Sequence, residues 1–224
     1  MKTNEDLQQD VEDAIKWEPM LHAAEIGVTA KNGIVTLSGT VDNYVKKIHA
    51  EKAARNVANV TAVVEEIKVI LPGSKIKSDY DIAADVVAAL HDNWDVPMEK
   101  VSVKVENGYV YLSGIVPWNY QKEAAKRTIQ SISGIKEIIN LIHINPEKHV
   151  ILNRQEVIDA LLRHWSVNAT NIQVGVSGDT VTLKGFVSSL YQKEEAAKVA
   201  WNTPGVLHVD NQLHIEFDYP NITL

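Results

Sequence analysis

One sequence pattern occurs three times in this 224-residue chain. Its clearest part reads NGIVTLSGTV at 32–41, NGYVYLSGIV at 107–116 and GDTVTLKGFV at 178–187. Aligned on Gly39, Gly114 and Gly185, the copies match without a gap over about thirty further residues. A period of about 70 residues indicates small repeated units rather than one large domain. We therefore expect three repeats, at residues 1–71, 78–146 and 152–217.

Each copy contains a β-hairpin with a two-residue turn. Asn32-Gly33 and Asn107-Gly108 fit a type I′ turn, which needs positive φ at both central residues, and Gly178-Asp179 fits type II′. Counting outward from the turn pairs Val103 with Leu112, and the same count applies to the other copies. Because side chains alternate along a strand, a fixed turn length places the same residues on the buried face in all three repeats.

Two amphipathic helices and a final strand complete each copy. The first helix begins near a capping residue (Asn4, Ser78 or Asn153, the last with Glu156 in a capping box) and ends near a tryptophan (Trp17, Trp94 or Trp165). A second helix follows the hairpin and stops at Asn59, Gly134 or Gly205. The resulting order, helix, strand, strand, helix, strand, predicts an α+β unit whose two helices cover one face of a three-stranded sheet.

Composition excludes several classes of protein. With 45% hydrophobic and 23% charged residues, the chain is typical of soluble globular proteins. The net charge of −7 argues against nucleic acid as a partner, because binding phosphates needs clustered basic residues. Cysteine is absent, so disulfides and thiolate metal sites are excluded. The acidic start lacks the features of a secretory signal and no apolar run could span a bilayer, so we expect a cytoplasmic protein.

The order and motifs of the repeats resemble the BON domain, named for bacterial osmotically induced and nodulation proteins. Its closing pattern, G-V-x-x-V-x-N-x-L-x-V, reads GIKEIINLIHI from Gly134, GVLHVDNQLHI from Gly205 and NVTAVVEEIKV from Asn59. The resemblance implies a mixed three-stranded sheet under two helices in each repeat. It also implies roles in envelope integrity, osmotic or general stress, peripheral phospholipid binding or the sensing of small ions, and it admits a periplasmic location or peripheral membrane association.

The sequence offers no catalytic constellation. The eight histidines lack the spacing of zinc ligands, and no acid and base pair stands out. Glycines occur singly rather than in a phosphate-binding loop, so Gly39, Gly114, Gly185, Gly134 and Gly205 are interpreted as structural residues at strand bends and helix ends. We therefore predict a non-enzymatic protein without cofactor or metal.

The candidate site is an apolar and aromatic surface of the middle repeat. Tyr109, Tyr111, Ile139 and Leu141 should point to the outer face of its sheet, opposite the helices. Such a patch marks packing against another repeat or self-association, a lipid or partner surface, or a small-molecule pocket. Further candidates are two tryptophans at positions where the sister repeats are polar, and basic residues that form either a patch or an ordinary solvated helix face: Trp118, Trp201, Lys122, Lys126 and Arg127.

Three hypotheses follow from these candidates. The first is a stress protein that binds phospholipid or an envelope protein through the second helices and exposed aromatic residues. The second is a cytosolic protein that compacts on binding a small cation such as potassium at acidic or carbonyl-lined sites between repeats. The third is a self-assembling scaffold, a homo-oligomer formed through the middle sheet.

Overall fold

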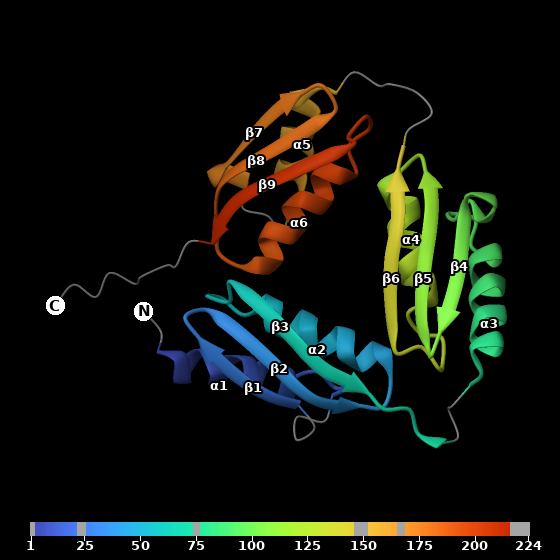
Figure 1. Cartoon of the computed structure of the whole chain (residues 1–224). Helices are drawn as coiled ribbons and strands as arrows, with labels where there is room; N and C mark the ends of the chain where they lie inside the picture. Colours follow the sequence, from blue (N-terminus) through green and yellow to red (C-terminus); the bar gives the residue numbers. More distant parts are fainter. Residues whose placement is uncertain (1–2, 22–25, 74–76, 146–151, 165–168, 216–224) are drawn as a thin grey trace. The chain divides into compact units, whose positions relative to one another are not determined.

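A computed structural model describes residues 3–21, 26–73, 77–145, 152–164 and 169–215, which form three α+β units (Figure 1). The first contains α1 (Asn4–Lys16), β1 (Ile26–Lys31), β2 (Ile34–Val41), α2 (Tyr44–Asn56) and β3 (Ala62–Val69). The second contains α3 (Asp79–Asp92), η3 (Met98–Lys100), β4 (Val101–Glu106), β5 (Tyr109–Val116), α4 (Asn119–Ile129) and β6 (Glu137–Ile144). The third contains α5 (Arg154–Arg163), η4 (Ala169–Asn171), β7 (Ile172–Ser177), β8 (Thr180–Val187), α6 (Leu190–Trp201) and β9 (His208–Ile215). The predicted order of elements is confirmed.

Each sheet is three-stranded, with the second strand of the hairpin at its centre. In the middle repeat, β4 pairs with β5 antiparallel and β6 pairs with β5 parallel, and β7, β8 and β9 repeat this arrangement. The observed register joins Val103 to Leu112, as counted from the turn. Asn107 and Gly108 have φ of 54° and 82°, as a type I′ turn requires. The mixed sheet is therefore confirmed.

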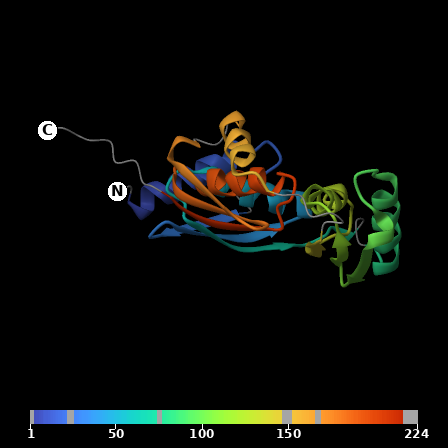
Figure 2. The same ribbon diagram turned by 90° about the horizontal axis from the view of Figure 1, so that it is seen from above.

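Both helices of a repeat pack on the same face of its sheet. For the third repeat, Figures 1 and 2 show α5 and α6 on one side of β7, β8 and β9. The buried side chains come from that side: Val157 and Leu161 of α5, Ala196 and Ala200 of α6, and Leu183 of β8 belong to one cluster. Burial of this shared apolar face stabilises the unit, and the opposite face of the sheet has no helix from its own repeat.

The first residue of the first helix fastens the hairpin turn. In the first repeat, Asn4 Oδ1 accepts a hydrogen bond from the N–H of Asn32 at 2.9 Å. The prediction that Asn4 caps α1 is therefore wrong, because its side chain reaches the hairpin instead. The helix is capped by Thr3, whose Oγ1 accepts from the N–H of Asp6 at 3.1 Å.

The same fastening is stronger in the middle repeat. The two carboxylate oxygens of Asp79 accept from the N–H groups of Asn107 and Gly108 at 2.7 and 2.8 Å. Ser78 caps this helix as predicted, accepting from the N–H of Asp81. The helix and the turn therefore hold each other in place, because the carboxylate satisfies both backbone donors of the turn.

The third repeat replaces the fastening residue and changes the cap. Arg154 stands at the first helical position, and its Nε donates to the backbone oxygen of Val174 at 2.6 Å. Asn153 caps the helix as predicted, but its Oδ1 accepts from the N–H of Gln155, one residue earlier than in a capping box. The predicted box with Glu156 is therefore wrong, and this carboxylate lines a groove described below.

An asparagine ties the last strand to the second helix in two repeats. Asn211 Nδ2 donates to the backbone oxygen of Lys193 in α6 at 2.7 Å, and its Oδ1 accepts from the N–H of Leu213 at 3.3 Å. Asn140 makes the same two bonds in the middle repeat, to Lys122 and Ile142. Each asparagine therefore satisfies a backbone donor of the last strand and a backbone acceptor of the helix.

Candidate functional site

The aromatic and apolar candidates of the middle repeat lie on the open face of its sheet. Tyr109 and Leu141 are 42% and 52% exposed, and Tyr111 and Ile139 are half-buried. The register places Tyr111 beside Ile139. These four residues, with Ile115, which is 55% exposed, form a surface that we call the open face.

A lysine lies over one ring of the open face. Lys104 on β4 lies across from Tyr111 on β5, with its Nζ 5.4 Å from the centre of that ring and 2.8 Å from the carboxylate of Glu106. The hydrogen bond and charge of Glu106 raise the pKa of Lys104 above its usual value. The lysine therefore stays charged, and it gives one margin of the open face a cation beside a ring.

Polar residues occupy the same face in the third repeat. Thr182 lies where the middle repeat has Tyr111, between Gly175 and Asp210. Apolar exposure there is limited to the end of the face, where the ring of Phe186 lies 6.1 Å from that of His214. The two tyrosines are therefore a feature of the middle repeat that the third repeat does not share.

The basic candidates lie on the other side of the middle sheet. Lys122, Lys126 and Arg127 belong to α4, which packs its Ala125 and Ile129 into the core under the sheet. Because the open face points away from the helices, the structure does not bring these cations together with the two tyrosines.

The two candidate tryptophans also lie apart from the open face. Trp118 precedes α4 and is 37% exposed, and its backbone N–H donates to Gln121 Oε1 at 3.2 Å. Trp201 is the last residue of α6 and packs, partly buried, against the core of its own repeat. The candidates named from the sequence thus occupy several separate places.

Among the described residues, the most exposed tryptophans are two that the sequence indicated only as markers of helix ends. Trp17 is the C-cap of α1 and is 86% exposed. Trp94 follows Asn93, the C-cap of α3, and is 92% exposed. Trp165, the corresponding marker in the third copy, lies outside the described residues. A signal was available, because polar or charged residues flank both rings in KWE and NWD.

The described ranges contain neither a cluster of metal-binding side chains nor a helix suited to crossing a membrane. Within them, no group of three or more His, Cys, Asp or Glu side chains could hold a metal ion. Of the helices in those ranges, none combines the length and the apolar character that a bilayer crossing needs.

Comparison with known proteins gives one family match along the chain. The family model described as "BON domain" matches residues 3–70, 78–146 and 153–216. The chain is 29% identical over 124 residues to "Osmotically-inducible protein Y" of Escherichia coli (strain K12), covering 54% of this chain and 62% of that protein. It is 29% identical over 122 residues to "21 kDa hemolysin" of Actinobacillus pleuropneumoniae, again covering 54% and 62%. The match thus spans less than two thirds of either relative.

One match among solved structures is the C-terminal domain of CdsD, described as a structural protein of the type III secretion system of Chlamydia trachomatis. The match covers 96% of this chain and 100% of the CdsD domain, with 17% sequence identity and a TM-score of 0.26. At this TM-score, the similarity carries no argument about the present protein.

Proposed function

This chain belongs to the BON domain family, and from that premise we propose that it is a non-catalytic, osmotic-stress-related protein of the bacterial envelope that attaches peripherally to phospholipid. The names of two relatives, an osmotically inducible protein and a hemolysin, support the stress and envelope parts of this proposal. The observation that carries the attachment is the exposure of Trp17 and Trp94.

An exposed indole suits the boundary between water and lipid. Its ring is apolar and its N–H is a donor, so tryptophan is enriched where one side of a residue is dry and the other wet. Burying one large apolar side chain contributes on the order of 2 kcal/mol. Each ring alone therefore gives weak, reversible attachment.

The charges around the rings favour neutral lipid. Lys16 and Glu18 flank Trp17 with opposite charges, Asp95 follows Trp94, and the whole chain carries a net charge of −7. Anionic headgroups attract polybasic segments and repel acidic ones. We therefore expect tighter attachment to phosphatidylcholine vesicles than to vesicles rich in phosphatidylglycerol, with the difference shrinking in salt.

Vesicle flotation tests the attachment. Replacing Trp17 and Trp94 together by serine is expected to lower the apparent affinity for vesicles at least about tenfold, so a smaller fraction of the protein should float. Tyr80→Ser is the matched control, because this ring is 82% exposed but lies at the start of α3. Equal flotation of the double variant and the unchanged protein would remove the proposal.

Self-association through the open face is a second candidate function. It is favoured by the exposure of Tyr109, Ile115 and Leu141 on one sheet face, since exposed apolar patches often mark protein contacts. Sedimentation at high concentration should show an oligomer that Leu141→Lys dissociates. A monomer throughout would remove this candidate.

Sensing of a small cation such as potassium stays a prediction. Its test is the circular dichroism and small-angle scattering of the whole chain in potassium and in sodium at equal ionic strength. Compaction in potassium alone would support it, and identical profiles in both salts would remove it.

A further inference from the structure

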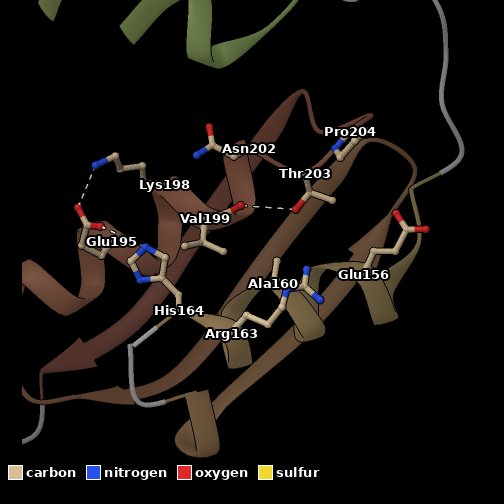
Figure 3. A pocket seen from close by; sticks show the side chains of 10 residues that line it. All are labelled: Glu156, Ala160, Arg163, His164, Glu195, Lys198, Val199, Asn202, Thr203 and Pro204. Atoms are coloured by element: carbon tan, nitrogen blue, oxygen red, sulfur yellow. Dashed lines mark hydrogen bonds and ion pairs between the residues drawn. The ribbon is translucent and has the colours of Figure 1, made fainter. Parts of the chain in front are cut away.

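A groove of about 450 Å³ runs between the two helices of the third repeat (Figure 3). One wall is the face of α5 that carries Glu156, Ala160 and Arg163, and the other is the last part of α6. The short segment after α6, including Thr203, closes one side. All of these residues belong to one repeat, so the groove needs no other part of the chain.

At one end of the groove the charges already have partners. Glu195 on α6 pairs with Lys198 at 3.2 Å, and its other carboxylate oxygen lies 3.8 Å from His164 Nε2 (Figure 3). The Glu195 side chain is only 16% exposed. The charged side chains at this end therefore pair with one another and join the two helices, so they are not available to a ligand.

In the rest of the groove, three exposed polar side chains have no partner among the described residues. Among the residues that the structure describes, Glu156, Arg163 and the side-chain amide of Asn202 have no hydrogen bond or ion pair. Thr203 is buried, and its hydroxyl makes only a long 3.5 Å contact with the backbone oxygen of Val199. The groove thus offers a free carboxylate, a free guanidinium and a free amide.

The two free charges face the groove from the same side of α5. Seven residues separate Glu156 from Arg163, which corresponds to about 10 Å along a helix axis. The Arg163 side chain runs back along α5 beside Ala160, toward the turn of the helix that carries Glu156 (Figure 3). A small molecule that carries both charges can contact both.

The charge balance of the groove selects its ligand. Glu156 and Glu195 oppose Arg163 and Lys198, so the lining residues have no net charge with histidine neutral. A zwitterion can pair with both of the exposed charges, Glu156 and Arg163, whereas a ligand with a single charge can pair with only one of them. No Trp, Tyr or Phe is among the described residues that line the groove, which favours an ammonium with N–H donors over a quaternary one.

We propose that this groove binds a small zwitterion that carries a primary ammonium and an acidic oxygen group. The ammonium donates to Glu156, and the carboxylate or phosphate accepts from Arg163. A free amino acid and a phosphoethanolamine headgroup share this chemistry. The binding does not require the membrane attachment proposed above.

The middle repeat lacks this arrangement at the aligned positions. Ala124, fully buried, stands in the register of Glu195, and Thr128 stands in the register of Val199. Asn93 Nδ2 donates to Thr128 Oγ1 at 2.5 Å and so bridges the two helix ends there. The middle repeat therefore serves as an internal comparison.

Nuclear magnetic resonance of the ¹⁵N-labelled whole chain tests the groove with defined probes. Phosphoethanolamine and β-alanine should give saturable shifts of the Asn202 and Thr203 amides. Ethanolamine alone and phosphate alone should bind at least about tenfold more weakly, because each satisfies one charge only. Equal affinity for either half, or no saturable shift with any probe, overturns the proposal.

Variants separate the groove from the rest of the protein. Glu156→Gln and Arg163→Gln should each weaken phosphoethanolamine binding at least about tenfold. Arg127→Gln, in the register of Lys198 but in the middle repeat, should leave it unchanged. A folded Glu156→Gln variant, shown by its dispersed amide spectrum, that binds as the unchanged protein does would contradict the assignment.

The two ligand sources are distinguished by competition. Vesicles of phosphatidylethanolamine that displace bound phosphoethanolamine, while phosphatidylcholine vesicles do not, would identify a lipid headgroup; displacement by neither supports a free zwitterion. Displacement by both to the same extent would overturn the specificity for a primary ammonium. Flotation through Trp17 and Trp94 should persist in Glu156→Gln, so failure of one proposal is visible apart from the other.

Discussion

Gly185 and Gly175 lie on neighbouring strands of the third repeat and have different surroundings. Gly185 has φ of 122°, and a Cβ there would lie 1.9 Å from the backbone oxygen of Asn171, which η4 brings against the strand. A Cβ on Gly175 would meet Thr182 at an ordinary 3.7 Å. The requirement for glycine at 185 is therefore a close approach of two backbones.

Replacing these glycines by alanine should have opposite consequences for the free energy of unfolding. Gly185→Ala should lower it by at least about 3 kcal/mol, because both the positive φ and the clash are unfavourable. Gly175→Ala should leave it unchanged or raise it by about 0.5 kcal/mol. Urea unfolding followed by circular dichroism measures both, and equal losses would contradict the explanation.

Asn211 gives a second prediction for a single residue. Asn211→Ala removes the bonds to the Lys193 oxygen and the Leu213 N–H, and it should cost about 2 kcal/mol because both backbone groups lose a partner. Hydrogen exchange of the Leu213 amide should accelerate. Gln212→Ala, on the neighbouring exposed position, is the control and should leave that exchange rate unchanged.

Candidate residues for binding were only partly accessible from sequence. Strand alternation placed Tyr109 and Leu141 on the open face, because a period of two is fixed once the turn is known. The exposure of Trp17 and Trp94 follows instead from where each helix ends, which short-range patterns define poorly. The groove between α5 and α6 could not be foreseen, since Glu156 and Asn202 come together only through helix packing.

At the scale of elements, the contact between the first helix and the hairpin differs among the repeats. The first residue of the helix makes this contact in each repeat. Asn4 forms one hydrogen bond with the turn, Asp79 forms two, and Arg154 forms one with the first strand of the hairpin. The first helical position thus joins helix and hairpin in all three repeats, through an amide, a carboxylate or a guanidinium.

Removal of the middle contact should loosen its turn. Asp79→Ala should lower the free energy of unfolding by about 1–2 kcal/mol, because the Asn107 and Gly108 donors lose their acceptors. Asp79→Asn should cost less, since its amide oxygen can still accept one bond as Asn4 does. Hydrogen exchange at Gly108 reports the loosening, and no change in Asp79→Ala would contradict it.

The elements themselves were predictable because turn, period and helix stops agreed. The hairpin registers are as counted, since a two-residue loop leaves one pairing that buries the apolar face. The caps were less secure: Asn4 and Thr3 are both good capping residues, and only the position of the hairpin shows that Asn4 is engaged elsewhere.

For the whole molecule, the third repeat should fold alone. Its buried cluster, from Leu152 to Leu213, consists only of residues of that repeat. A fragment of residues 152–217 is expected to unfold cooperatively in urea, with marginal stability for its size. A fragment without a cooperative transition would show that the predicted boundaries do not define an independent unit.

The proposed functions are assigned to different repeats of the chain. The shared pattern accounts for the fold of each unit, whereas Tyr109 and Tyr111 occur in the middle copy and the groove residues occur in the third. Repetition therefore predicts the architecture well and the sites poorly, because a binding site depends on the positions where copies differ.

The unequal burial of the tryptophans gives the protein two built-in optical reporters. Trp17 and Trp94 are almost fully solvated, whereas Trp201 packs against a core. In a variant with Trp118 and Trp165 replaced by phenylalanine, emission at long wavelength, quenched readily by iodide, should therefore originate at the first two rings, and a shorter-wavelength component shielded from iodide at Trp201. One spectrum can thus report occupancy of the surface rings and integrity of the third repeat without any attached dye.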